Sequence, residues 1–285
     1  MLISFGYDIS LGLQVGTTML FCLKVHPSRH KDLVVGENFR IEPARSFEEY
    51  SDTFGNLCGR VYCEPGIVRF VNNGIIRDSG ELDRFAPEAP QLEIWQLPVN
   101  SLLFLLASRY CETDSELLDF AWTTFGTTKP GWARVQAICD FVNGHLEFDY
   151  LKARANRTAL EAFRERVGVC RDFTHLAITL CRCMNVPARY VTGYLGDIGI
   201  PPAPYPMDFS AWMEVFLGGK WYAFDPRHNC RRIGRIVMAR GRDASDVALT
   251  TIFGKHTLEN FVVNTDEVSD DFQSKPLSPA LQTAS

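Results

Sequence analysis

Short apolar runs separated by turn residues fill the first third of the chain. Two such stretches are TTMLFCLKV, which begins at Thr17, and GRVYCEPGIVRFVNNGIIRDSG, which begins at Gly59. This pattern is typical of antiparallel strands. The pair Asn73-Gly74 predicts a tight hairpin turn between two of these runs. We therefore predict an antiparallel β-domain over residues 1–90.

A proline-containing segment, FAPEAPQLEIWQLPVN, follows this region and predicts a linker. From Ser101 onward, apolar residues recur three and four positions apart, which indicates helices. The helical stretches include SELLDFAWTTFG, WARVQAICDFVNGHLEF and NRTALEAFRERVG, and the last of these ends at Gly168. A central helix then begins at Cys170 and is expected to run to about Met184.

Three strand patterns follow this helix, in ARYVTGYL, FSAWMEVFL and KWYAFD. Helices therefore precede a group of strands in this part of the chain. We assign residues 91–262 to one region of mixed helices and strands. The polar, acidic residues 263–285 predict a flexible tail.

The composition is that of an ordinary globular protein, with 46% hydrophobic and 22% charged residues among 285. The net charge of -5 argues against a nucleic-acid partner or an anionic membrane surface. The N-terminal residues do not read as a signal peptide, and no apolar run has the length of a membrane span. We therefore expect a cytoplasmic protein with its nine cysteines reduced.

Cys170 is the first candidate for chemistry, because it stands in the first turn of the predicted central helix. The helix dipole and the free backbone N–H groups at this end favour the thiolate, which is the reactive form of a cysteine. The same N–H groups can stabilise an oxyanion if the thiolate attacks a carbonyl. The alternative is a buried structural cysteine, which is common in proteins.

A hairpin predicts the second candidate, Asp225. If Gly218 and Gly219 form a two-residue loop, Phe216 pairs with Trp221 and the strands run back to Ser210 and Asp225. Residues two apart along a strand share a face, so positions 210 and 225 become diagonal neighbours, about 7–8 Å apart. A carboxylate at this place could orient a base for the nucleophile. It could equally end the strand before Pro226.

The blocks GVCRDFTHLAITLCRCMNVPARYVTGYL and MDFSAWMEVFLGGKWYAFDPRHN resemble the core of the transglutaminase-like superfamily, particularly its bacterial cysteine-protease branch. The first third of the chain is similar to the N-terminal β-domain of that branch. The resemblance implies a papain-like α+β fold, with Cys170 as nucleophile and Asp225 as the orienting carboxylate. It also implies an enzyme that cleaves or transfers at an amide or peptide bond through a Cys170 acyl-thioester.

The chain departs from the superfamily motif at one position, because Ser210 stands where the motif has the catalytic histidine. A serine hydroxyl is not basic near neutral pH. His228 follows Asp225 closely and is the leading substitute base, although it could also be a turn histidine that bonds a backbone carbonyl. His175 points about 140° away from Cys170 around the same helix, so we expect it to pack elsewhere.

Two further residues are candidates for contact with a substrate. Trp212 could line a groove, although an aromatic strand residue belongs more often to the core. Asp172 could brace the loop beside the nucleophile, or simply complement the dipole of its helix. No metal or organic cofactor is expected, since Cys181 and Cys183 face different directions and no acidic loop suits calcium.

Two functions remain open at this point. The first is a cysteine enzyme that acts on a peptide or protein substrate. The second is a catalytically impaired homologue that binds a peptide or protein in the same groove, with the chemistry lost at Ser210.

Overall fold

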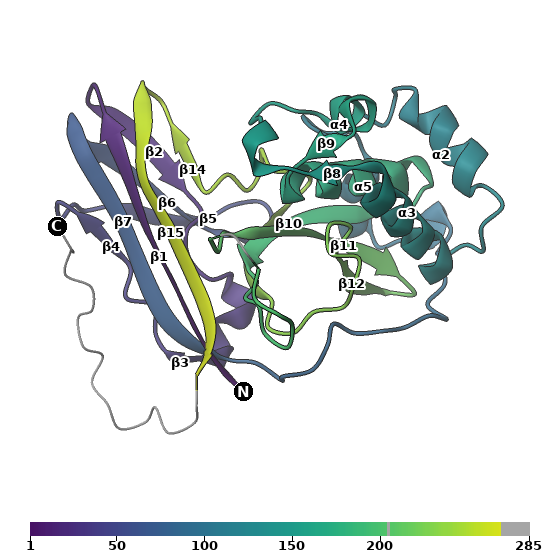
Figure 1. The fold of residues 1–285 in the computed structure, drawn as a ribbon, viewed down its shortest axis with the longest axis horizontal. Coiled ribbons are helices and arrows are strands. Elements are labelled where there is room, and N and C mark those ends of the chain that lie inside the picture. The colour runs from purple at the N-terminus through teal and green to yellow at the C-terminus, as the bar shows by residue number, and fades with distance from the viewer. Residues whose placement is uncertain (204–205, 269–285) are drawn as a thin grey trace.

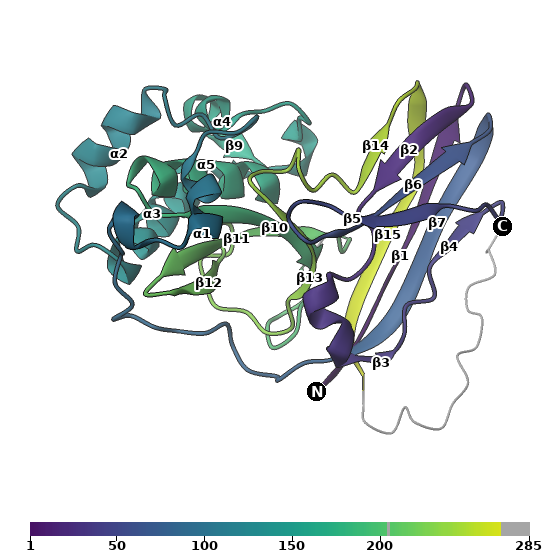
Figure 2. The ribbon, with the colours of Figure 1, turned by 180° about the vertical axis from the view of Figure 1, so that it is seen from behind.

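The chain folds into an antiparallel β-domain beside an α+β core, as a computed structural model of residues 1–203 and 206–268 shows (Figure 1). The predicted fold class is confirmed. The β-domain has two sheets, and the core has one four-stranded sheet whose longer helices pack on one face (Figure 1 and Figure 2).

The first sheet of the β-domain has the order β15-β1-β7-β3, and β4 also pairs with β7. Its strands are β1 (Leu2–Leu13), β3 (Leu33–Val35), β4 (Arg40–Glu42), β7 (Gly66–Arg77) and β15 (His256–Val268). The second sheet has the order β14-β2-β6-β5. Its strands are β2 (Thr17–Phe21), β5 (Glu48–Ser51), β6 (Leu57–Cys63) and β14 (Thr250–Ile252).

Strand β1 shows why these residues form a sandwich. Its odd-numbered side chains from Ile3 to Leu13 are all buried, whereas four of the even-numbered ones are partly exposed. A period of two places one face of the strand in a core and the other near solvent. That core also contains Tyr194, Ile236 and Met238 from the α+β core, so the two domains pack against each other.

The sheet of the α+β core has the order β12-β11-β10-β13, and every pairing is antiparallel. Its strands are β10 (Ala188–Tyr194), β11 (Ser210–Leu217), β12 (Lys220–Phe224) and β13 (Ile236–Gly241). The helices are α1 (Val99–Leu102), α2 (Leu117–Phe125), α3 (Trp132–His145), α4 (Ala159–Glu165) and α5 (Cys170–Cys183). Shorter elements are η1 (Pro27–Asp32), η2 (Ile94–Gln96), η3 (Leu103–Leu105), η4 (Tyr150–Lys152), β8 (Glu147–Phe148) and β9 (Val167–Gly168).

Helix α5 is the centre of the core. Every residue from Asp172 to Cys183 is buried, because β10 and β11 cover one side of the helix and α2, α3 and α4 cover the others. A helix in this position has no solvent face, so its buried polar side chains need partners: His175 accepts from the N–H of Ala244, and Arg182 donates to the carbonyl of Ala188.

The two-residue loop at Gly218 and Gly219 confirms the predicted hairpin. Both glycines have positive φ, of 53° and 84°, as a type I′ turn requires. Phe216 pairs with Trp221 and Leu217 with Lys220, which is the predicted register.

The predicted turn at Asn73-Gly74 is wrong. Both residues lie inside the continuous strand β7, where Gly74 pairs with Phe5 of β1. A Cβ at position 74 would stand 2.7 Å from Cζ of the Phe5 ring, so the glycine makes room for an aromatic side chain rather than for a turn.

The predicted domain boundaries also need correction at the C-terminal end. Strand β14 pairs with β2, and β15 pairs with β1 along almost the whole of that strand. Residues 250–268 therefore belong to the two sheets of the β-domain, not to the core or to a tail. The free edges of β1 and β2 explain this return, because an unpaired edge offers a row of backbone donors and acceptors. The remainder of the predicted tail, 269–285, lies outside the described residues.

None of the described helices is long and apolar enough to cross a membrane.

Candidate functional site

Cys170 is the first residue of α5 and follows the short strand β9. The helix begins here because the Asp172 carboxylate turns back and accepts a hydrogen bond from the backbone N–H of Val169 at 2.9 Å. Nη1 of Arg157 lies 3.0 Å from the same carboxylate. Both ionic side chains are buried, so this pair fixes the position of the helix start and of the sulfur.

A cavity of about 610 Å³ opens in front of Cys170. Part of its wall comes from the core, through Cys170 and Arg171 of α5, residues of β10, and the segment 208–211 at the start of β11. The other part comes from the chain that returns to the β-domain, over residues 244–251 and Phe261 of β15. The cavity therefore lies between the two domains, and its volume is in the range of sites for small ligands or single side chains.

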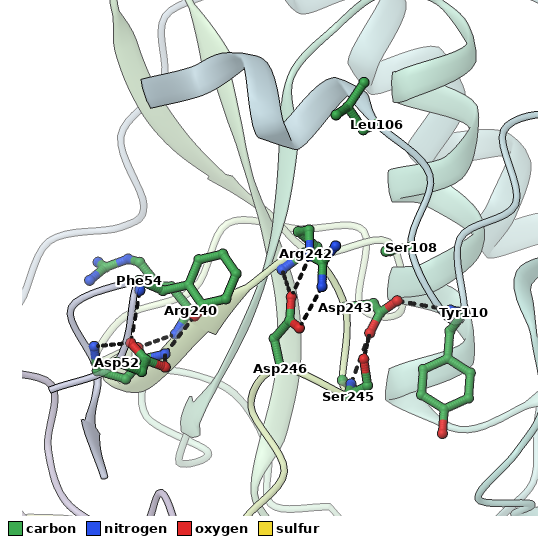
Figure 3. A network of polar contacts seen from close by, with 12 residues as sticks. Asp52, Phe54, Leu106, Ser108, Tyr110, Arg240, Arg242, Asp243, Ser245 and Asp246 are labelled. Atoms are coloured by element: carbon green, nitrogen blue, oxygen red, sulfur yellow. Dashed lines mark hydrogen bonds and ion pairs between the residues drawn. The ribbon is translucent and has the colours of Figure 1, made fainter. Parts of the chain in front are cut away.

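Buried polar contacts shape the returning part of the wall (Figure 3). The carboxylate of Asp243 accepts hydrogen bonds from the backbone N–H of Tyr110 at 2.8 Å and from Ser245 at 2.8 and 2.6 Å. Arg242 donates to Asp246 through its side chain at 2.9 and 3.0 Å. These contacts hold the loop after β13 against the helical part of the core, so Tyr110 and Ser245 face the same cavity as Cys170.

The thiol of Cys170 is held in its protonated form. Burial, and after it the negative charge of Asp208, raise its pKa to about 11. Arg227 and a backbone hydrogen bond from Ala211 act in the opposite direction, but they do not offset the burial. The positive end of a helix dipole favours a thiolate, yet at this helix start desolvation is the larger effect.

Ser210 is the first residue of β11, where it pairs with Gly193 of β10, and it lines the cavity together with Cys170. From the sequence resemblance we expect the superfamily histidine at this position. Among the described residues that line the cavity, none is a histidine.

Asp225 follows the last residue of β12 and is buried. Its Oδ2 atom lies 2.9 Å from Nδ1 of His228 and 3.1 Å from Nη2 of Arg235, and its Oδ1 atom accepts the backbone N–H of His228 at 3.0 Å. Burial by itself would raise the pKa of this carboxyl group, but Arg235 and the bonds from His228 hold the pKa well below its usual range. Asp225 is therefore an ionised carboxylate that orients an imidazole.

The imidazole of His228 lies at a second, smaller cavity. Asp208, Phe209 and Ser210 line both this cavity and the cavity of Cys170, so the segment 208–210 borders the two. The structure thus brings together His228 and Asp225, and separately Cys170 and Ser210. It does not place His228 in the wall of the cavity that Cys170 lines.

The two candidates for substrate contact lie in the interior instead. Trp212 is 1% exposed and packs with Val191 and Val237, and the guanidinium of Arg235 lies 4.9 Å from its ring centre. Asp172 is buried beneath the start of α5 and pairs with Arg157. Neither lines the cavity, so the predicted contacts are corrected: Trp212 is a core residue and Asp172 holds the helix start.

His175 packs elsewhere, as the sequence predicts. It is buried, its ring stacks on Tyr110 at 5.1 Å, and its Nε2 atom accepts the backbone N–H of Ala244 at 3.1 Å. Burial lowers the pKa of this imidazole to about 3, so the ring is neutral.

Sequence reasoning missed two residues of the site. Asp208 lines both cavities, and burial raises its pKa although the backbone N–H of Phe209 and the charge of Arg227 act against this. Asp208 stands two residues before Ser210, and residues two apart in an extended segment lie on the same face. The sequence could therefore have indicated that Asp208 and Ser210 face the same site. Arg235 contacts Asp225 from ten residues away, and no local pattern marks that pairing.

Comparison with known proteins supports the fold. Residues 120–226 match the Transglutaminase-like superfamily. A crystal structure of a protein from Cytophaga hutchinsonii, described as a putative cysteine protease, is 27% identical and superposes with a TM-score of 0.81, over 99% of this chain and 94% of that chain. The similarity to that structure includes the β-domain.

Two mycobacterial relatives are also similar. An uncharacterized protein of Mycobacterium leprae is 31% identical over 107 residues, which are 36% of this chain and only 38% of that relative. An uncharacterized protein of Mycobacterium tuberculosis is 26% identical over 238 residues, which cover 75% of this chain and 74% of the relative.

Proposed function

Because residues 120–226 of this chain belong to the transglutaminase-like superfamily, we propose that the chain binds a peptide or protein segment in the cavity of Cys170 without forming an acyl-thioester. The observation that carries the proposal is Ser210, which lines the cavity at the motif position of the catalytic histidine. The protein is thus a catalytically impaired member that keeps the groove of the superfamily.

The electrostatics of the cavity support this function. A cysteine nucleophile needs a base with a pKa near neutral to accept its proton, and a serine hydroxyl has no such basicity. The nearby carboxylate of Asp208 favours the neutral thiol, since a negative charge opposes a second negative charge. A neutral thiol beside a serine hydroxyl is a pair of weak polar groups that suits binding better than nucleophilic attack.

The walls of the cavity favour a peptide as the occupant. Tyr110, Thr192 and Ser245 offer hydroxyl groups, while Val247, Leu249 and Phe261 offer apolar surface. This mixture matches an amino-acid side chain with its adjoining amide groups. The cavity lies between the two domains, so a bound segment would contact both.

A second function is favoured by the contact between His228 and Asp225. An imidazole oriented by a carboxylate is the usual base for a cysteine nucleophile. Since Ser210 lines the cavities of both Cys170 and His228, its hydroxyl could pass a proton between them. In this alternative the chain is a cysteine enzyme that cleaves or transfers at an amide bond.

Acylation separates the two functions. The wild-type protein, Ser210→His, Cys170→Ser and His228→Ala are each incubated with p-nitrophenyl acetate, and the acetyl adduct at Cys170 is followed by intact mass and peptide mapping. We expect Ser210→His to acylate at least about 100-fold faster than the wild type, since a general base contributes roughly that factor. Wild-type acylation as fast as that of Ser210→His would overturn the proposal, and its loss in His228→Ala would establish the enzyme.

Binding is tested with a displayed library of random peptides. We expect selected peptides to bind the wild type and Cys170→Ser equally, and to lose binding when Cys170→Trp fills the cavity. Trp95→Ala, a change at an exposed residue that does not line the cavity, serves as the control. Peptides whose binding is insensitive to Cys170→Trp would contradict the proposed site.

A further inference from the structure

Two cysteine side chains of the β-domain are in direct contact. The sulfur atoms of Cys22 and Cys58 lie 3.1 Å apart, and both residues are free cysteines. They are 8% and 5% exposed, so their sulfurs lie just beneath the surface. Neither residue belongs to the site of Cys170.

Strand register explains the contact. Phe21 of β2 pairs with Gly59 of β6, so the next residues along the two antiparallel strands, Cys22 and Cys58, stand opposite each other. The backbone N–H of Cys22 donates to the carbonyl of Leu249 at 3.0 Å, on the side away from β6. Cys22 and Cys58 are therefore opposed as a non-hydrogen-bonded pair, the closer of the two kinds, with Cα atoms about 4.5 Å apart.

This arrangement is already that of a cross-strand disulfide. Disulfides join residues whose Cα atoms are about 4.4–6.8 Å apart, and a non-hydrogen-bonded pair falls within this range. Closing the bond needs no movement of β2 relative to β6. Cys181 and Cys183 differ from this pair, because residues two apart on one helix face different directions.

We propose that Cys22 and Cys58 form a modification site, a dithiol that hydrogen peroxide oxidises to an intramolecular disulfide. The oxidant is a small, neutral peroxide, which suits sulfurs that are nearly but not wholly covered. The inference rests only on the β-domain and does not depend on the proposed function of Cys170.

The two thiols have different roles in the reaction. A hydrogen bond from Cys22 lowers the pKa of Cys58, while the same contact and burial raise the pKa of Cys22. Tyr50, which pairs with Cys58 across β5 and β6, also lowers the pKa of Cys58, whereas burial and Asp52 raise it. We therefore assign the first attack to Cys58 and the resolving role to Cys22.

The reaction balances with one molecule of peroxide. The Cys58 thiolate attacks one oxygen, the O–O bond breaks, and a sulfenic acid and hydroxide form; the thiol proton converts this hydroxide to water. The sulfur of Cys22 then attacks the sulfenic sulfur, the S–O bond breaks, and the second thiol proton leaves with that oxygen as water. The two sulfurs lose two electrons, and the peroxide is reduced to two waters.

The site adjoins the wall of the large cavity. Leu249, whose carbonyl accepts from Cys22, lines that cavity, and Thr250 and Thr251 beside it pair with β2. A disulfide would join β2 covalently to β6 directly behind this wall.

The experiment oxidises the full-length reduced protein with a small excess of hydrogen peroxide. The protein is then unfolded in acid, its free thiols are alkylated, and it is digested for peptide mapping. We expect the oxidised wild type to lose two hydrogen atoms in mass, to yield a Cys22–Cys58 cross-linked peptide, and to recover both thiols after dithiothreitol. Cys63→Ser, a matched change at another buried cysteine of β6, should still form the cross-link.

Single variants test the assigned order of attack. Cys22→Ser should leave Cys58 as a sulfenic acid that dimedone traps, whereas Cys58→Ser should leave Cys22 unoxidised at the same peroxide concentration. Circular dichroism confirms that each variant is folded. Two results would overturn the proposal. The first is that, after oxidation, Cys22 and Cys58 remain free thiols to the same extent as Cys63. The second is that Cys58 is converted to sulfinic acid and no cross-link forms.

Discussion

Nδ1 of His228 lies 2.9 Å from Oδ2 of Asp225, three residues earlier in the chain. This is the contact between base and orienting group that a cysteine nucleophile normally uses. In this chain it forms at the small cavity beside the segment 208–210, whereas Cys170 lines the large one. Asp225 thus contacts an imidazole, while the thiol of Cys170 lines another cavity together with Ser210.

Arg235 is expected to stabilise the fold more than any exposed arginine, because it is buried and pairs with two carboxylates. It lies 3.1 Å from Asp225 and 2.9 Å from Asp83, which follows β7 in the chain. Arg235→Met should lower the free energy of unfolding by about 3 kcal/mol, since it leaves a buried carboxylate without its cation. Urea denaturation measures this loss. The exposed Arg164, changed to Met, is the control and should leave the free energy nearly unchanged.

Asp172→Ala should destabilise the start of α5. The change removes the acceptor for the Val169 N–H and leaves the buried guanidinium of Arg157 with only Glu165 as its ionic partner. We expect a loss of about 3 kcal/mol in the free energy of unfolding, as for other buried pairs that lose one member. A loss below about 1 kcal/mol would show that Asp172 is not needed at this helix start.

The thiol of Cys170 should lose its proton only in alkaline solution. Since burial raises its pKa to about 11, its alkylation by iodoacetamide should be slow at neutral pH and should rise steeply only in strongly alkaline solution. The exposed Cys230 should react faster near neutral pH. Asp208→Asn removes a negative charge next to the sulfur, so it should move the midpoint to lower pH.

Peptide mapping of the alkylated protein resolves the two cysteines, and Cys170→Ser identifies the signal. A midpoint near that of an ordinary cysteine, about 8.5, would contradict the protonated thiol on which the binding function depends.

His175 should make the protein sensitive to acid. Its imidazole pKa is lowered to about 3 in the folded state by burial, while the unfolded chain takes up a proton below about pH 6.5. The stability that the neutral ring contributes is therefore present above about pH 6.5 and is lost progressively as the pH falls toward 3. Between about pH 6.5 and about pH 5 the loss should be about 2 kcal/mol.

Denaturation at several pH values measures this slope, and His175→Phe should reduce it. The phenylalanine keeps the ring that stacks on Tyr110 and removes the titrating group. The charged groups that act on His175 are Asp243, Arg171 and Arg182. A residual slope should remain, because burial also lowers the pKa of His26, to about 4. An unchanged slope in His175→Phe would contradict the role of His175.

Several features of this protein were predictable from short stretches of sequence. The start of α5 at Cys170, the two-glycine hairpin with its register, and the replacement of the motif histidine by Ser210 all depend on residues close together in the chain. Local backbone preferences and turn chemistry decide such features before any distant contact forms.

Only the tertiary structure decided the rest. Strands β14 and β15 return to the β-domain because β2 and β1 have free edges there, which no pattern within residues 250–268 reveals. The pairing of Arg235 with Asp225, and the contact of Cys22 with Cys58 across two strands, likewise depend on sheet register. The partial burial of Cys170 is also a tertiary effect, because the cavity that it lines has walls from both domains. Short stretches of sequence indicate the candidate nucleophile and the serine at position 210, whereas the packing of distant segments raises the pKa of the thiol.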